Sequence, residues 1–429
     1  MPSEDYSSDA RIGSYRQQES RFAGSSSHDW KAGVQARSTA PIGAPKKPSS
    51  GGLAGIIAGE SSICTVALGS GLNYRGYNVV DLAREATFEE VVHLLLMGEL
   101  PTQEQLTALK QKLCDARQLP PQVLAVLKLI PKEAHPMDVL RTTCSVLGTL
   151  EPETAPSVQQ VEIALRLIGG FAGALNYWYH FSNSGKEISL QSNPEDSVAV
   201  NFLKLLHGDP EFKPHPVVAK TLDTSLILYA EHDFNASTFA CRVTAGTRSD
   251  LYSCICSGIG TLKGPLHGGA NEAALEMLMP LRSVDKAKRR LEEAFSRREL
   301  VMGFGHRMYK NGDPRAPLMR GLAEALAKAK LPHSDPIMVQ VGAFMEEEML
   351  KRKKMHPNVD FSAAIAYKQC GVPMAFFTPL FAIARTAGWA AHVFEQRAVN
   401  RLIRPASLYV GPAPRPYLPR ERRVPSAKL

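Results

Sequence analysis

The sequence lacks several features that would each define a class of protein. Its seven cysteines are scattered and include no C-x-x-C pair, so neither a disulfide framework nor a cysteine zinc site is indicated. No uncharged apolar run reaches the roughly 18 residues of a membrane-spanning helix, because Arg385 interrupts the best candidate, residues 373–394. Alternating β-branched runs are nearly absent, and residues 62–67 form the only plausible strand. We therefore expect a soluble, reduced and mainly helical protein.

The body of the chain also lacks an excess of either charge. The whole sequence carries a formal net charge of +8, with 50 Lys and Arg against 42 Asp and Glu. The first 50 residues hold seven basic and five acidic side chains, and residues 401–429 hold seven and one, which leaves 36 of each sign between. A basic C-terminal tail on a neutral body is a weak nucleic-acid signal, so no nucleic-acid partner is predicted.

The two ends of the chain carry only faint targeting signals. Residues 1–50 are rich in Ser, Gly, Arg and Gln without apolar periodicity, and we expect them to be a disordered extension. They lack the apolar core of a secretory signal, and several acidic residues count against a transit peptide. The last three residues, Ala427-Lys428-Leu429, resemble the S-K-L peroxisomal address. In a eukaryotic host we predict a peroxisomal location, with the mitochondrial matrix or the cytoplasm as alternatives.

Helical periodicity dominates from residue 51 onward. Thr87 opens a capping box before an apolar helix, and Gly98 ends that helix. Pro101-Thr102 opens a second helix, and residues 285–300, 322–331, 341–354 and 373–394 have the pattern of further helices. The last of these is apolar throughout except for Arg385, so we expect it to lie in the core.

The length and charge density indicate two domains. A chain of 429 residues exceeds the size that one hydrophobic core usually supports. Residues 281–355 are highly charged, whereas the stretches on either side are apolar, as expected of a small domain inserted into a larger one. The predicted division is a disordered extension (1–50), a large helical domain (51–275 and 367–415), a small helical domain (276–366) and a basic tail (416–429).

Three short segments hold most of the residues that indicate chemistry. They are G-P-L-H-G-G-A-N-E (264–272), G-F-G-H-R-M-Y-K-N-G-D-P-R (303–315) and H-P-N-V-D-F (356–361). They place His267 and His306 in glycine-rich turns, Arg315 behind an Asp-Pro, and Asp360 behind a Pro-Asn. Such a set can polarise a carbonyl, bind a dicarboxylate and remove a proton from carbon. The segments straddle the expected domain boundaries, where a cleft would open.

Each of these residues also has a structural alternative. His267 can be a turn histidine bonded to backbone, and Asp360 can be a helix N-cap. Lys310 can be solvated rather than bound to a phosphate, and Arg385 can meet an internal carboxylate rather than a ligand anion. No spacing matches H-E-x-x-H or another paired-ligand motif, so no metal is predicted.

Together with E-H-D-F-N-A-S-T-F (231–239) and R-T-A-G-W-A-A-H (385–392), these segments resemble the signature of the citrate synthase family. The likeness runs from Gly51 to about Arg423. The resemblance implies an all-α, two-domain homodimer whose cleft, between the large and small domains, closes on substrate. It also implies an acyltransferase that condenses an acyl-CoA with oxaloacetate, needing no cofactor because the coenzyme A thioester is a substrate. We expect no membrane association.

The resemblance also implies a role for each matching residue. Asp360 matches the base that takes the α-proton of the acyl-CoA. His267 matches the donor to the thioester carbonyl, and His306 the histidine that polarises the ketone of oxaloacetate. His232, Arg315 and Arg385 match oxaloacetate-binding residues. Arg404 matches an arginine that reaches in from the other subunit, and Phe381 a packing residue beside the site. Arg307 and Lys310 are cationic side chains beside His306 that can bind the phosphates of coenzyme A.

Within the family, four segments resemble the 2-methylcitrate synthase branch, which prefers propionyl-CoA: residues 130–142, 177–181, 202–208 and 392–406. The segment H-R-M-Y-K-N-G-D-P-R (306–315) instead resembles bacterial citrate synthases. We predict that propionyl-CoA, oxaloacetate and water give 2-methylcitrate and coenzyme A, with acetyl-CoA also accepted. The alternative is a citrate synthase that uses mainly acetyl-CoA. A catalytically inactive scaffold protein is an alternative of another class.

Overall fold

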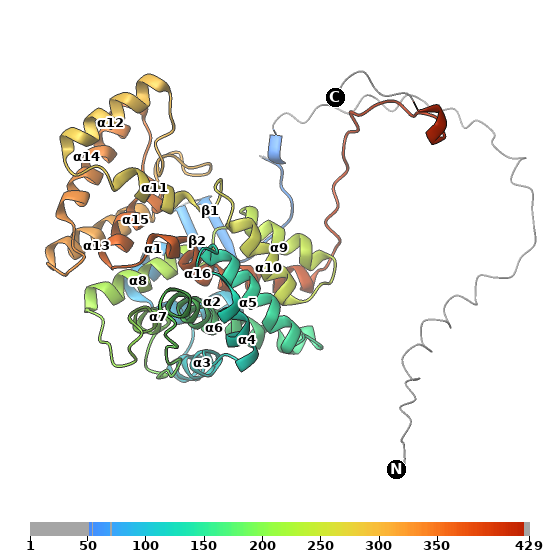
Figure 1. Cartoon of the computed structure of the whole chain (residues 1–429), viewed down its shortest axis with the longest axis horizontal. Helices are drawn as coiled ribbons and strands as arrows, with labels where there is room; N and C mark the ends of the chain where they lie inside the picture. The colour runs from blue at the N-terminus through green and yellow to red at the C-terminus, as the bar shows by residue number, and fades with distance from the viewer. Residues whose placement is uncertain (1–50, 54, 69–70, 424–429) are drawn as a thin grey trace, which may run out of the picture. The chain divides into compact units, whose positions relative to one another are not determined.

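The computed structural model describes residues 51–53, 55–68 and 71–423 (Figure 1). The chain divides into two units, one spanning Ala58–Pro405 and one formed by Met1–Ile57 with Ala406–Leu429. The predicted disordered extension and the Ala-Lys-Leu end lie outside the described residues. In the second unit the described segments contain two short 3-10 helices, η2 (Gly51–Leu53) and η4 (Arg420–Arg422), and otherwise irregular backbone.

The larger unit is mainly helical, as the sequence predicted. Its described residues form sixteen α-helices and one short 3-10 helix: α1 (Val79–Glu85), α2 (Phe88–Met97), α3 (Gln103–Ala116), α4 (Pro121–Leu129), α5 (Pro136–Leu150), α6 (Pro156–Ser184), α7 (Val198–His207), α8 (Pro216–Tyr229), α9 (Ala236–Gly246), α10 (Leu251–Leu262), α11 (Ala270–Leu278), α12 (Val284–Arg297), α13 (Ala316–Lys328), α14 (Pro336–Lys353), α15 (Val359–Gln369), η3 (Met374–Phe376) and α16 (Phe377–Ala398). No helix within the described ranges has both the length and the hydrophobicity needed to cross a bilayer.

The predicted strand is present, but two further strands were not predicted. β1 (Cys64–Leu68), β2 (Gly71–Tyr74) and β3 (Tyr77–Asn78) form an antiparallel sheet in the order β1-β2-β3. The turn between β2 and β3 consists of Arg75 and Gly76, both with positive φ (48° and 91°). Two-residue hairpin turns of this kind usually contain Asn-Gly or Asp-Gly. An Arg-Gly turn between very short strands gives little signal in the sequence.

The local helix signals behave as predicted at α2 and α3. Thr87 and Glu90 bond each other's backbone in a full capping box, and Gly98 ends α2 with φ of 97°. Thr102 is the N-cap of α3. Helices α13 and α14 begin about one and a half turns earlier than predicted, at Ala316 and Pro336. The reason is a proline in the first turn of each, a position that favours helix initiation.

Helix α16 forms the centre of the core. Every residue from Phe377 to Val393 is buried, and α16 packs against α2, α6, α8, α9 and α10. Gly258 of α10 faces the Trp389 ring, where an added Cβ would lie 3.0 Å from two ring atoms. This close approach fixes how α10 crosses α16. The core helix predicted at 373–394 is thus confirmed, although it starts as η3 and continues beyond residue 394.

Helices α12, α13 and α14 lie together on one side of α16 in Figure 1. Helix α12 packs on α14, and α13 packs on α14, α15 and α8. These helices carry most of the highly charged segment that the sequence assigned to a small domain. The boundaries predicted for the large and small domains stay a prediction.

Candidate functional site

A cavity of about 540 Å³ lies where the motifs of the sequence analysis meet, between the end of α8, the beginnings of α9 and α15, and the first half of α16. Eight of the ten predicted site residues line it: His232, His267, His306, Arg307, Arg315, Asp360, Phe381 and Arg385. Lys310 lies in an adjoining cavity that shares Gly305 and His306 with the first. Arg404 is exposed in the segment that follows α16 and does not line either cavity.

Backbone pairing joins the second and third motifs directly. The amide of Gly305 donates to the carbonyl of His356 (2.8 Å), and the amide of Asn358 donates to the carbonyl of Gly303 (2.9 Å). Gly303 has φ of 84°, and a Cβ there would lie 2.7 Å from Cβ of Phe361. Only glycine fits this turn, because both the backbone conformation and the space exclude a side chain. The pairing therefore carries His306 and Asp360 to the same cavity.

Asp360 lies in the first turn of α15 rather than at its N-cap. The N-cap is Asn358, whose side chain accepts a hydrogen bond from the amide of Phe361 (3.2 Å). The Oδ1 atom of Asp360 accepts a hydrogen bond from the Tyr229 hydroxyl (2.7 Å). Burial raises the pKa of Asp360, while the Tyr229 hydrogen bond and the charge of Arg315 oppose that rise. The carboxylate is consequently a stronger base than an exposed aspartate.

The proton of His267 is placed by its neighbours. Its Nε2 lies 3.3 Å from the amide nitrogen of Ser237 and 2.8 Å from Oγ of the same serine. An amide N–H can only donate, so Nε2 is the acceptor and Nδ1 carries the proton. Ser237 Oγ itself accepts from Nε1 of Trp389 (3.1 Å). Burial, helped by Arg385, lowers the pKa of His267 to about 4. His267 is therefore a neutral hydrogen-bond donor at neutral pH.

His306 has the opposite tautomer. Its Nδ1 accepts from the backbone amides of Met308 (3.1 Å) and Tyr309 (3.4 Å), so the proton is on Nε2. Burial, helped by the charge of Arg315, lowers the pKa of His306 to about 4. The ring of His232 lies 5.2 Å from the His306 ring, and its Nε2 is 3.0 Å from the Tyr309 hydroxyl. Burial likewise places the pKa of His232 well below its usual value. The cavity thus contains three uncharged imidazoles.

The two buried arginines differ in their partners. Arg315 forms a two-point ion pair with Asp313, with Nε to Oδ1 at 2.9 Å and Nη2 to Oδ2 at 2.8 Å. Arg385 donates through Nε to the carbonyl of Tyr229 (2.8 Å) and lies over the Phe381 ring. Its Nη1 is buried without a hydrogen-bond partner among the described residues, where Arg385 makes no ion pair. Arg385 thus forms no direct internal ion pair among the described residues, although the charge of Glu231 acts on it, and its free N–H suits an anionic ligand.

Several residues of the site were not identified from the sequence. Tyr229 contacts Asp360 and Ser237 contacts His267, and no local sequence motif predicts either tertiary contact. Asp313 is the carboxylate that pairs with Arg315, and the D-P-R spacing gave a signal for it. Lys354, the C-cap of α14, has φ of 56° and lines the adjoining cavity of about 220 Å³ together with Lys310. Two lysines at this edge give a positive rim beside the three imidazoles.

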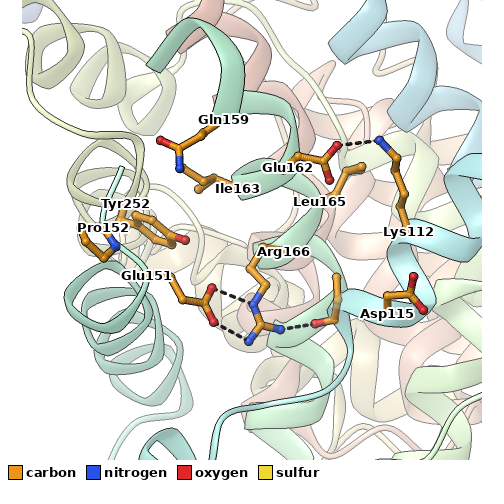
Figure 2. Close-up of a pocket in the computed structure, with 11 residues that line it drawn as sticks. Lys112, Asp115, Glu151, Pro152, Gln159, Glu162, Ile163, Leu165, Arg166 and Tyr252 are labelled. Carbon is orange, nitrogen blue, oxygen red and sulfur yellow. Dashed lines mark hydrogen bonds and ion pairs between the residues drawn. The ribbon is translucent and has the colours of Figure 1, made fainter. Parts of the chain in front are cut away.

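Another cavity, of about 420 Å³, lies away from the motifs, among α3, α6 and α10 (Figure 2). Its two basic side chains are paired with acidic ones: Arg166 forms a two-point ion pair with Glu151 (both contacts 3.0 Å), and Lys112 pairs with Glu162 (2.6 Å). Arg166 also donates to two backbone carbonyls. With these donors engaged, we assign no ligand to this cavity. Across the described residues, no group of three or more His, Cys, Asp or Glu side chains is arranged to hold a metal ion.

Comparison with known proteins agrees with this geometry. The sequence matches the family described as citrate synthase, C-terminal domain, over residues 52–406. It is 48% identical over 375 residues to a 2-methylcitrate synthase of Shewanella oneidensis, covering 87% of this chain and 98% of that protein. It is 38% identical over 377 residues to a citrate synthase of Synechocystis, covering 87% and 94%.

Solved structures give the same result. The citrate synthase of Thermotoga maritima aligns with a TM-score of 0.76 at 38% identity, covering 87% of this chain and 99% of that one. A ternary complex of citrate synthase from the archaeon Thermoplasma acidophilum, with carboxymethyl coenzyme A and oxaloacetate, aligns with a TM-score of 0.79 at 31% identity, covering 86% and 98%.

Proposed function

This chain belongs to the citrate synthase family and is a condensing enzyme of the acyltransferase type, and we propose that its main reaction converts propionyl-CoA, oxaloacetate and water to 2-methylcitrate and coenzyme A. The observation that supports the condensing reaction is the meeting of Asp360, His267 and His306 around one cavity, beside a buried arginine with a free N–H. The choice of propionyl-CoA is supported by the identity to a 2-methylcitrate synthase. Together they provide a base, two neutral donors and an anion site.

Removal of the α-proton is the energetically difficult step. That proton has a pKa of roughly 20, against about 4 for an ordinary aspartate, and the difference corresponds to roughly 22 kcal/mol. Burial raises the pKa of Asp360, but one carboxylate cannot close such a gap. The larger share has to come from stabilising the developing oxyanion. The Nδ1–H of His267 is suited to this, because a neutral imidazole donates without first requiring a proton from solvent.

The second substrate needs two anion sites and one polarising donor. Arg385 offers an unpartnered N–H to one carboxylate of oxaloacetate, and Arg315, already paired with Asp313, offers a second positive surface. The Nε2–H of His306 is free to donate to the ketone oxygen, which draws electrons from the carbon that the enolate attacks. Phe381, packed beside Tyr229, provides an apolar wall. Water then hydrolyses the thioester and releases coenzyme A.

Other parts of the proposal concern the surroundings of the site. Arg307 and Lys310, together with Lys354, are placed to meet the phosphates of coenzyme A at the positive rim. We propose that the enzyme is a homodimer in which Arg404, exposed in the single chain, enters the cavity of the partner subunit. Closure of a small domain over a large one would then exclude water from the enolate. No metal or bound cofactor is required by this scheme.

The acyl preference is tested by comparing kcat/KM for propionyl-CoA and acetyl-CoA at saturating oxaloacetate, with release of the free thiol as the signal. One methylene in an apolar pocket is worth about 1–3 kcal/mol, so we expect propionyl-CoA to be preferred by about tenfold, with acetyl-CoA still used. A preference for acetyl-CoA would make the protein a citrate synthase, the alternative that the Synechocystis relative favours.

A peroxisomal location is proposed only for a eukaryotic host, from Ala427-Lys428-Leu429. The two sequence relatives named above give no support to it, since both come from bacteria. The last dozen residues fused to a fluorescent protein test the proposal in a eukaryotic cell. Punctate signal is expected, and diffuse cytosolic signal would refute it.

A further inference from the structure

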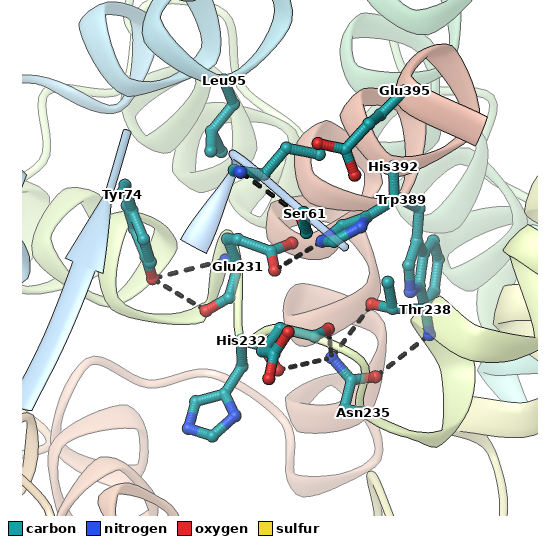
Figure 3. A network of polar contacts seen from close by, with 12 residues as sticks. Ser61, Tyr74, Leu95, Glu231, His232, Asn235, Thr238, Trp389, His392 and Glu395 are labelled. Atoms are coloured by element: carbon teal, nitrogen blue, oxygen red, sulfur yellow. Dashed lines mark hydrogen bonds and ion pairs between the residues drawn. The ribbon is translucent and has the colours of Figure 1, made fainter. Parts of the chain in front are cut away.

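Glu231, the residue before His232, is buried with one carboxylate oxygen unbonded (Figure 3). Its Oε1 is 2.9 Å from Nε2 of His392, whereas Oε2 has no hydrogen-bond partner among the described residues. The backbone at Glu231 is fixed separately, because the Tyr74 hydroxyl donates to its carbonyl (3.0 Å). An unbonded carboxylate oxygen in a protein interior is costly, so its presence calls for a physical reason.

His392 is held so that it must donate to Glu231. Arg242 Nη1 lies 3.0 Å from Nδ1 of His392, and a guanidinium can only donate, so Nδ1 is the acceptor. In the neutral ring the remaining proton is on Nε2 and points to Glu231. Arg242 is anchored in turn by Glu395 Oε2 (2.7 Å), and Glu395 accepts from the amide of Ser62 (2.7 Å). The chain of contacts restrains the Glu231 carboxylate through residues that do not line the cavity.

Arg385 carries the complementary unbonded group. Its Nε is held by the Tyr229 carbonyl, and its Nη1 is buried without a partner among the described residues. Burial lowers the pKa of Arg385, and Glu231 is the charge that most opposes this change. The two residues are thus opposite charges close enough to affect each other, yet they form no ion pair within the described structure.

Glycine at position 388 permits this arrangement. A Cβ at Gly388 would lie 2.2 Å from Oε2 of Glu231 and 2.3 Å from the carbonyl of Ala230. The carboxylate therefore lies against α16 within one turn of Arg385. Any side chain at this position would displace either the carboxylate or the backbone that leads into His232.

We propose that His392 is a positioning residue that holds Glu231 away from Arg385, so that the negative charge stays near while the guanidinium N–H stays open for a substrate carboxylate. The inference rests on the proposed binding of oxaloacetate. A direct pair between Glu231 and Arg385 would occupy the same N–H, and oxaloacetate would have to break that pair in order to bind. Held apart, the two charges still attract each other without blocking the site.

The test measures oxaloacetate binding by calorimetry on the full chain. His392→Ala removes the donor and frees Glu231 to pair with Arg385, so we expect the Kd to rise by about tenfold or more. Adding Glu231→Gln removes the competing charge, and we expect the Kd of the double variant to return to within about threefold of the wild-type value. His392→Gln retains an N–H donor on that side and is expected to bind like the wild type. His180→Ala is the matched control, because His180 bonds only carbonyls of α7 outside the cavity.

Each result decides the inference. If His392 had only a structural role, the losses of oxaloacetate affinity caused by the two substitutions would add in the double variant. That outcome would overturn the inference. If His392→Ala does not fold, Glu231→Gln alone decides: binding at least as tight as wild type supports the inference, and weaker binding refutes it. Failure of the wild-type protein to bind oxaloacetate would overturn the proposed function and this inference together. If the wild-type protein binds oxaloacetate but the losses of affinity in the double variant are additive, the inference is overturned and the proposed function stands.

Discussion

Tyr229 donates a hydrogen bond of 2.7 Å to Asp360, although 131 residues separate them in the sequence. The hydroxyl comes from the last residue of α8 and the carboxylate from the first turn of α15. The contact stabilises the ionised carboxylate, whereas burial opposes ionisation. The basicity of Asp360 is therefore set by two helices that meet only in the folded chain.

Tyr229→Phe should move the acid limb of the pH profile to higher pH. The Tyr229 hydrogen bond lowers the pKa of Asp360, so its removal raises that pKa further, and the base then becomes ionised only at higher pH. Phenylalanine keeps the ring packed on Phe381. The measurement is kcat/KM for the acyl-CoA between pH 5 and 9, and a shift to lower pH would contradict the assignment of Asp360 as the base.

Asp360→Asn should reduce condensation by at least about a hundredfold while leaving oxaloacetate binding intact. The asparagine keeps the shape of the carboxylate but cannot accept the α-proton. Steady-state thiol release gives the rate, and calorimetry with oxaloacetate gives the affinity. Loss of oxaloacetate affinity in this variant would show that Asp360 binds oxaloacetate, which would contradict its assignment as the base that acts on the acyl-CoA.

His267 should make the protein less stable in acid. Its pKa is about 4 in the folded state and about 6.5 when unfolded, so the unfolded chain binds more protons below pH 6.5. The contribution of the neutral His267 ring to the free energy of unfolding is complete above pH 6.5 and is lost as the pH falls toward 4. His267→Asn should therefore differ less from the wild type at pH 4.5 than at pH 7.5 in denaturant unfolding. A difference that grows in acid would contradict the lowered pKa.

Arg404→Ala should be inactive alone but active in mixed dimers with Asp360→Asn. If each cavity takes Arg404 from the partner subunit, a mixed dimer contains one cavity in which both residues are intact. About a quarter of wild-type activity per dimer is the ceiling for random mixing at equal amounts. Mixing the two purified variants after mild dissociation and measuring thiol release tests this. Absence of recovered activity in verified mixed dimers would argue that the sites are not shared.

The sequence predicted several helix ends and the core helix. The Thr87 and Glu90 capping box and the αL residue Gly98 depend only on side chains within one helical turn, and both are present. The long apolar run with one arginine predicted a core helix, and α16 is that helix. The turn at Arg75-Gly76 was missed, since the usual turn residues are absent and packing rather than local preference sets the two short strands.

The site depended on more than local pattern. Motifs marked His267, His306 and Asp360 as reactive types, but their tautomers and pKa values follow from Ser237, from the backbone after His306, and from Tyr229. The unbonded N–H of Arg385 and the restrained charge of Glu231 likewise exist only once α8 and α16 pack together. Helix ends and turns are decided by neighbours along the chain, so sequence determined them. Burial and charge at a point in the interior are sums over residues distant in sequence, so only the tertiary structure decided the chemistry of the cavity.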